Sequence, residues 1–304
     1  MRRSKQRKRE ASWNSGPAGY LFAAPAVIFF TAFVGLPIII NVAVLSFADF
    51  SLLGDFKWVG LKNFRDLFAD PATKTILLNT LKLFAVLVPV HIIGGLIVAS
   101  LINAVRNKFF HTVFRVSLYF PMVVTTASVA IVWGYLYDTE FGVFNWVLEM
   151  MGLGKVRWLG DANWALFSIA IFSAWKFIGN AFLYYYIGLR NVPESYIEAA
   201  QIDGASKWKA FFTVKIPLLT PTIFFVVTTT LINCFQVFDE PYFLTKGGPG
   251  VSSQTIAMQI YRTGFNEYHF GYASALGVVL FLLVIAVTII MFSTQKKWVT
   301  YDTE

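Results

Sequence analysis

Charged residues are scarce in this chain of 304 residues, where they make up 14% of the positions, while hydrophobic residues make up 57%. A soluble domain carries about 25% charged residues, whereas this chain has a mean hydropathy of +0.61. The composition therefore excludes disordered, collagen-like and disulfide-scaffold chains, and it disfavours a soluble globular enzyme.

Side chains that bind metals or perform catalysis are also scarce. Cys234 is the only cysteine, so the chain forms no internal disulfide and no multi-cysteine zinc site. The three histidines, at positions 91, 111 and 269, form no His-x-x-x-His pair. The sequence lacks G-x-x-x-x-G-K-[ST], G-x-S-x-G and H-E-x-x-H. It therefore predicts no catalytic residue, no bound metal and no cofactor on this chain, which argues against an intramembrane enzyme.

Long apolar runs are abundant, and six of them reach the roughly 20 residues that a helix needs to cross a bilayer core. We place these runs at residues 20–47, 76–104, 113–136, 164–189, 217–239 and 273–293. The first run is too long for the apolar region of a signal peptide, so we expect it to be retained. The predicted fold class is an all-α membrane protein with six transmembrane helices.

The distribution of lysine and arginine predicts the orientation of these spans. With the N-terminus inside, 15 of the 25 basic residues fall in inside segments and 8 in outside loops, while Lys82 and Lys176 lie within spans. Cytoplasmic loops are enriched in basic residues, so both termini are expected in the cytoplasm. The net charge of +8 therefore indicates a membrane surface and not a nucleic-acid partner.

The runs divide the chain into four expected parts: a basic N-terminal segment at 1–19, a first span with its external loop at 20–75, a core of five spans at 76–293, and a tail at 294–304. The three outside loops, at 48–75, 137–163 and 240–272, carry the aromatic residues Trp58, Phe64, Phe68, Trp146, Trp158 and Tyr261. These rings form either an aromatic belt at the membrane interface or a docking surface for an external partner.

The inside loop at 191–217 has the pattern of a helix–turn–helix elbow. Asn191 can cap a first helix of about two turns, and Gly204 can adopt the left-handed conformation that ends it. Ser206 can cap a second short helix, which we expect to end before Pro217. From these residues alone, the loop also fits an amphipathic hairpin lying at the membrane interface.

The residues of this elbow closely resemble the EAA loop of ABC-importer permeases. The resemblance rests on Glu198-Ala199-Ala200, on Asp203-Gly204, and on the segment Val214-Lys215-Ile216-Pro217. The family pattern ends in I-x-L-P, so Val214 and Ile216 are conservative departures from it. Glu198, Ala199, Ala200, Asp203 and Gly204 are thereby implied to form a coupling helix that docks in a groove of an ATPase subunit, although Glu198 alone would also suit a solvated helix face.

Further segments resemble the carbohydrate branch of these permeases, namely residues 59–64 (VGLKNF), 243–249 (FLTKGGP), 260–265 (IYRTGF) and 270–275 (FGYASA). The resemblance covers nearly all of the chain from about residue 20, and it is closest to the first permease of a maltose- or glycerol-phosphate-type pair. It implies a type I ABC importer transmembrane domain in a bacterial-type plasma (inner) membrane. The implied partners are a second permease subunit, an ATPase dimer that binds ATP and Mg, and an external sugar-binding protein.

Polar side chains within the fourth and fifth spans form the expected substrate path. They are Ser173, Trp175, Lys176, Phe177, Asn180, Thr230, Asn233, Cys234 and Gln236. Amides both donate to and accept from hydroxyl groups, and aromatic rings suit the apolar faces of a sugar. Each of these residues also fits a role in holding helices together. Thr125, Thr126 and Ser128 of the third span are weaker candidates, and Cys234 stands where the maltose type has an amide.

Lys176 is unusual because it falls near the middle of the fourth run. A lysine at the centre of a span costs about 2.5–3.5 kcal/mol on insertion scales, so we expect it to face a cavity or an ionic partner on the second permease. A carboxylate at the same depth, which a stand-alone proton- or sodium-coupled carrier would favour, is not predicted for any run. A stand-alone secondary carrier or channel is the alternative function.

Overall fold

A computed structural model of the chain describes residues 17–51, 56–105 and 107–300. Nearly all of the basic N-terminal segment predicted at 1–19 lies outside the described residues. Among the described residues, five helices are long and apolar enough to cross a membrane: Gly19–Phe47, Pro71–Asn103, Ala165–Asn191, Lys207–Phe235 and Phe270–Lys297. The bent pair Lys108–Val123 and Thr126–Leu136 passes the same test when its two helices are taken together, and counting it as one span brings the number to six. The predicted all-α membrane fold is therefore confirmed, with five to six candidate spans.

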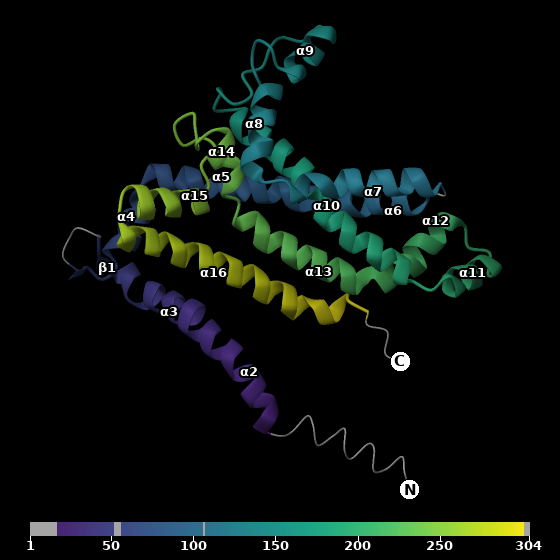
Figure 1. Ribbon diagram of the computed structural model, residues 1–304, viewed down its shortest axis with the longest axis horizontal. Coiled ribbons are helices and arrows are strands. Elements are labelled where there is room, and N and C mark those ends of the chain that lie inside the picture. The colour runs from purple at the N-terminus through teal and green to yellow at the C-terminus, as the bar shows by residue number, and fades with distance from the viewer. Residues whose placement is uncertain (1–16, 52–55, 106, 301–304) are drawn as a thin grey trace.

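The spans are assembled from the following elements: α2 (Pro17–Phe30), η1 (Thr31–Gly35) and α3 (Leu36–Ala43); α5 (Pro71–Pro89), η3 (Val90–Gly94) and α6 (Gly95–Asn103); α7 (Lys108–Val123) and α8 (Thr126–Leu136); α10 (Ala165–Asn191); α12 (Lys207–Ala210), η4 (Phe211–Lys215) and α13 (Ile216–Phe235); α16 (Phe270–Thr294) and η6 (Gln295–Lys297). Connecting elements are α4 (Lys62–Ala69), α9 (Val143–Met150), α11 (Glu194–Ile202), α14 (Asp239–Leu244), α15 (Ile256–Tyr261) and η5 (Arg262–Asn266). In Figure 1, α4 and α15 lie at one end of the bundle and α11 and α12 at the other.

Short π-helical turns occur where proline disturbs a span. Proline has no N–H group, so a helix that continues through it lacks one backbone hydrogen bond. The π-helical turns η1 and η4 end one residue before the residue pairs Leu36-Pro37 and Ile216-Pro217, and η3 directly follows Pro89. Leu36 N–H bonds to Thr31 C=O, five residues back, which keeps the helix continuous through the irregular turn.

The third span differs from the prediction of one helix at 113–136. It begins earlier, at Lys108, and it breaks between Val123 and Thr126, where the chain bends by 104° from α7 to α8. Pro121 lies within α7, and the break follows it by only a few residues. Backbone carbonyls freed by such a break need donors, because no water reaches them inside a bilayer.

The helix α10 is the centre of the bundle. Half of its most apolar 18-residue window is buried inside the chain, compared with none of the corresponding window of the first span. Its Phe182, Tyr185 and Leu189 pack with Ala99 of α6 and Leu219 of α13. The first span instead extends away from the other helices towards its N-terminus (Figure 1), and no residue of its most apolar window is buried.

The loops predicted to be external are folded and not simple connectors. Ala48–Asp49 (β1) and Lys57–Trp58 (β2) form a short antiparallel pair, with Ala48 opposite Trp58. Asn79 of α5 donates to the carbonyls of Val251 and Gln254 at 2.9 and 3.1 Å, which ties the last loop to the second span.

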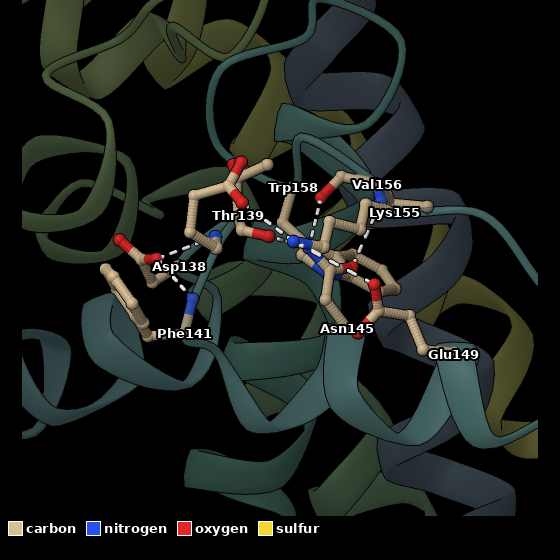
Figure 2. A network of polar contacts seen from close by, with 9 residues as sticks. Asp138, Thr139, Phe141, Asn145, Glu149, Lys155, Val156 and Trp158 are labelled. Atoms are coloured by element: carbon tan, nitrogen blue, oxygen red, sulfur yellow. Dashed lines mark hydrogen bonds and ion pairs between the residues drawn. The ribbon is translucent and has the colours of Figure 1, made fainter.

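The loop at 137–163 is organised around Asn145, which is 1% exposed (Figure 2). Its amide nitrogen donates to the carbonyls of Thr139 and Val156, at 3.0 and 2.9 Å. Its oxygen accepts from the Val156 N–H and from Trp158 Nε1, both at 3.0 Å. On the same loop, the backbone N–H groups of Phe141 and Glu140 lower the pKa of Asp138.

The six aromatic residues of the loops predicted to be external differ in burial, and Phe64 and Tyr261 are half-buried. Trp158 is buried in a cluster with Trp133 and Tyr137, so it belongs to the core. Trp58, Phe68 and Trp146 are exposed. For these three, the membrane belt and the external docking surface both stay predictions.

Candidate functional site

A cavity of about 380 Å³ lies among the second, fourth and fifth spans and the short helix α14. Its lining includes seven of the nine residues predicted for the substrate path: Ser173, Phe177, Asn180, Thr230, Asn233, Cys234 and Gln236. Leu87, His91, Met122, Ala181, Tyr184, Val226, Thr229, Val237, Phe238, Asp239 and Glu240 complete the lining. The cavity therefore combines amides, hydroxyl groups and aromatic rings.

The helix period explains why these residues meet. Ser173, Phe177 and Asn180 follow one another at spacings of four and three, so they share one face of α10. Thr230, Asn233 and Cys234 share a face of α13 in the same way. Gln236 differs from the expectation of a residue within the fifth span, because the helix ends at Phe235 and Gln236 is its exposed C-cap.

Trp175 does not line this cavity. Its side chain is 42% exposed and its ring lies 5.1 Å from that of Trp133 on α8. It belongs to an aromatic cluster on the other side of α10.

Lys176 also points away from the cavity, although it was expected to face a cavity or an ionic partner on another chain. It is 1% exposed, and its Nζ donates to the carbonyls of Pro121 at 3.0 Å and of Val124 at 2.7 Å. These carbonyls lie at the break between α7 and α8. The ammonium group thus supplies the donors that the broken third span requires.

The other polar residues at this break, Thr125, Thr126 and Ser128, do not line the cavity. The hydroxyl groups of Thr125 and Ser128 bond to each other at 2.9 Å.

Eleven lining residues were not predicted for the substrate path, and His91 and Glu240 are the two ionisable ones among them that are buried. Both are buried, with exposures of 8% and 5%. The Ser173 hydroxyl donates to Glu240 Oε1 at 3.0 Å. A polar residue two positions after Pro89 was the available signal for His91, whereas the short helix that returns Glu240 to the bundle has no clear sequence signature.

The elbow at 191–217 has the predicted first helix and stop. The helix α11 ends at Ile202, and Gly204 has φ of +84°. The N–H of Ala205 bonds to the Ala200 carbonyl at 2.9 Å and that of Gly204 to the Gln201 carbonyl at 3.0 Å, which is a Schellman stop. All five predicted coupling residues lie in this turn or on α11, and Glu198, Ala199, Asp203 and Gly204 are exposed.

Two details of the elbow were predicted wrongly. Asn191 is the last residue of α10 and not a cap, because Pro193 is the N-cap of α11. The second helix starts at the Ser206 cap as expected, but it does not end before Pro217. Helix runs without interruption from Lys207 to Phe235, because the π-helical turn η4 accommodates the proline. The elbow is therefore continuous with the fifth span.

Exposed apolar side chains project from the elbow, including Tyr196, Ile202 and Trp208. Beside α11 lies a second hollow of about 920 Å³ whose lining includes Lys108, His111, Arg115, Arg190 and Lys215 together with Glu194 and Glu198. Within the described part of the chain, no ion pair joins Glu198 to any of these bases. An exposed carboxylate and apolar side chains on a short rigid helix make a surface suited to another protein.

Comparison with known proteins supports this reading of the geometry. Residues 91–299 match the family described as "Binding-protein-dependent transport system inner membrane component". The chain is 33% identical to the sulfoquinovosyl glycerol transport system permease protein SmoG of Agrobacterium fabrum, over 88% of this chain and 87% of that protein. It is 31% identical to the lactose transport system permease protein LacF of Rhizobium radiobacter, over 92% of this chain and 94% of that protein.

The fold has a solved counterpart. A subunit of a bacterial ABC transporter for import of the acidic polysaccharide alginate superposes with a TM-score of 0.79 at 23% identity, covering 98% of this chain and 99% of that chain. The match of more than two thirds of the sequence to one family, together with this fold and six apolar spans, settles its class. The chain belongs to the inner-membrane components of binding-protein-dependent transport systems, the permease subunits of ABC importers.

Proposed function

We propose that this chain forms part of the translocation path of an ATP-driven carbohydrate importer, with the cavity between α10 and α13 as its sugar site. The observation that carries the proposal is the lining itself. Asn180, Asn233 and Gln236 offer amides that donate and accept, and Phe177 offers a ring. The relatives named for lactose and for sulfoquinovosyl glycerol support a carbohydrate as the cargo.

The elbow is the proposed coupling element. Glu198, Ala199, Ala200, Asp203 and Gly204 would form the surface that docks on an ATPase subunit. Because α12, η4 and α13 form one helix, a displacement of the elbow would act directly on the fifth span and on Asn233 within the cavity. ATP hydrolysis, with Mg, would take place on the ATPase dimer, and this chain would be no enzyme.

The remaining partners follow from what the chain leaves uncovered. No residue in the most apolar window of the first span is buried within this chain, which supports a second permease subunit as its neighbour in a heterodimer. The folded external loops would receive the sugar-binding protein. In this arrangement both termini and the elbow lie in the cytoplasm, and the four-part division of the chain at residues 19, 75 and 293 is retained as a proposal.

The test is uptake by the complete importer reconstituted in vesicles with its binding protein and ATPase dimer. Exchange of both Asn180 and Asn233 for alanine should raise the half-saturation for sugar by about tenfold, because each lost hydrogen bond to a neutral group is worth about 0.5–1.5 kcal/mol. Basal ATPase activity should remain. Asn163→Ala, in an exposed external turn, is the matched control. Unchanged uptake kinetics in the double variant would remove the cavity from the path.

A further inference from the structure

The cavity is lined by acidic side chains but by no lysine or arginine of the described residues, and this limits the kind of carbohydrate that fits. Asp239 and Glu240 both line it, and no lysine or arginine of the described residues does. Glu240 is almost fully buried, with the Ser173 hydroxyl donating to its Oε1. Ionised carboxylates accept hydrogen bonds but donate none, so this end of the cavity calls for donors.

His91 is a second polar residue of the lining that bears on ligand binding. It lies on the π-helical turn η3, a kind of helix irregularity that is frequent at functional sites. Its side chain is buried, and Nε2 has no hydrogen-bond partner within the described residues. A buried polar atom left unpaired is costly, so a partner is expected from a bound molecule. A hydroxyl group of a sugar in the cavity supplies one.

The nearest buried lysine, Lys176, is not available as a basic partner for a ligand in the cavity. Lys176 acts on Glu240 through space. However, its ammonium group already donates to the Pro121 and Val124 carbonyls and does not line the cavity. A carboxylate entering the cavity would therefore meet the carboxyl groups of Asp239 and Glu240 without gaining a lysine or arginine partner.

We infer that the cavity accepts neutral and amine-bearing carbohydrates and rejects acidic ones, with Glu240 setting the charge preference and His91 contacting a hydroxyl group. The inference rests on the proposed carbohydrate function. It predicts a charge preference unlike that of the transporter for alginate, an acidic polysaccharide, and unlike that of the relative named for sulfoquinovosyl glycerol, whose sulfonate group is also anionic.

The experiment compares three sugars that differ at one substituent: glucose, glucosamine and glucuronate, together with their β-1,4-linked disaccharides. Binding to the purified complex of both permeases and the ATPase dimer is measured by saturation-transfer NMR without the external binding protein, so that only the membrane site selects. Wild type should bind glucuronate about tenfold more weakly than glucose, because like charges repel strongly where water is partly excluded. Glu240→Gln should reduce that difference and also lower the preference for glucosamine.

His91→Phe should weaken all three sugars by a similar factor, and His91→Gln, which keeps a hydrogen-bonding group, should recover most of the binding. Glu149→Gln, an exposed carboxylate on α9 outside the cavity, is the control and should change nothing. Equal binding of glucuronate and glucose by wild type, or an unchanged charge preference in Glu240→Gln, would overturn the inference while leaving carbohydrate import intact. Binding of none of the sugars would instead count against the proposed function itself.

Discussion

Lys176 is a charged residue within a membrane span, and its role is to stabilise the packing of two helices. Its two hydrogen bonds reach the carbonyls at the break of the third span. Removing the ammonium group leaves these acceptors without donors, at about 1–3 kcal/mol for each, and removal of the buried charge offsets part of this loss.

We therefore expect Lys176→Met to lower the thermal midpoint of the purified complex by several degrees, corresponding to about 1–3 kcal/mol. The measurement is thermal unfolding followed by tryptophan fluorescence. Lys82→Met, which removes an exposed lysine from the second span, is the control and should leave the midpoint in place. Equal midpoints for both variants would show that the break holds without Lys176.

Sequence reasoning recognised that Lys176 needs a special environment, but not which one. A pattern gives the depth of a lysine in a span, and depth alone does not distinguish a cavity from a carbonyl pair on a neighbouring helix. The partners Pro121 and Val124 are more than 50 positions away. Glu240 follows directly after the fifth apolar run at 217–239, and its return into the bundle depends on the tertiary position of α14.

At the scale of helices, the packing of α7 against α10 depends on Gly179. A Cβ atom at this position would lie 2.3 Å from the carbonyl oxygen of Leu118, so any larger residue forces the two helices apart. The close approach resembles the small-residue contacts by which membrane helices commonly associate.

Gly179→Ala should accordingly destabilise the complex by about 1–3 kcal/mol, the usual effect of overpacking. Gly134→Ala tests the same substitution where a Cβ would meet nothing within 4 Å, and alanine should be harmless there. Both effects can be read from the yield of assembled complex and its thermal midpoint. A loss in the Gly134 variant equal to that in the Gly179 variant would refute packing as the cause.

The stop of α11 offers a cleaner test because Gly204 is not crowded. Its φ is +84°, and a Cβ would meet no atom within 4 Å. The free-energy cost of replacing Gly204 therefore comes from its positive φ and not from a steric clash with neighbouring atoms. Asparagine tolerates the left-handed region, whereas valine does not.

We expect Gly204→Val largely to abolish uptake and Gly204→Asn to retain most of it. Glu198→Ala should weaken docking by roughly ten- to a hundredfold, if a charge-assisted contact of about 1.5–3 kcal/mol is lost. The readout is the ATPase rate stimulated by loaded binding protein in vesicles, at equal subunit content. Wild-type stimulation in Gly204→Val and Glu198→Ala would make the elbow a bystander.

The elements were easier to predict than their junctions. Hydropathy gave all six spans, because a bilayer demands long apolar helices whatever their packing. The elbow was readable from Gly204 and Ser206, since left-handed stops and hydroxyl caps are local. The continuity of helix through Pro217 and the sharp turn after Val123 depend instead on π-helical backbone and on a lysine from another helix, which no local pattern encodes.

For the molecule as a whole, the orientation rests on the counts of lysine and arginine and can be tested directly. In a Cys234→Ala background, Ser206→Cys probes the elbow and Met151→Cys probes the loop after α9. Both positions are exposed. An impermeant maleimide should label position 151 in intact cells and position 206 only after the membrane is permeabilised. The reverse labelling pattern would show that the predicted orientation in the membrane is wrong and that both termini lie outside.

The uncovered first span has a consequence for how the protein is made. A helix that satisfies its own backbone, and whose most apolar window has no residue buried against the other five spans, needs little packing to lie in lipid. It can therefore settle in the bilayer while the spans that follow it are still being translated. Those spans are then inserted from a helix that is already anchored.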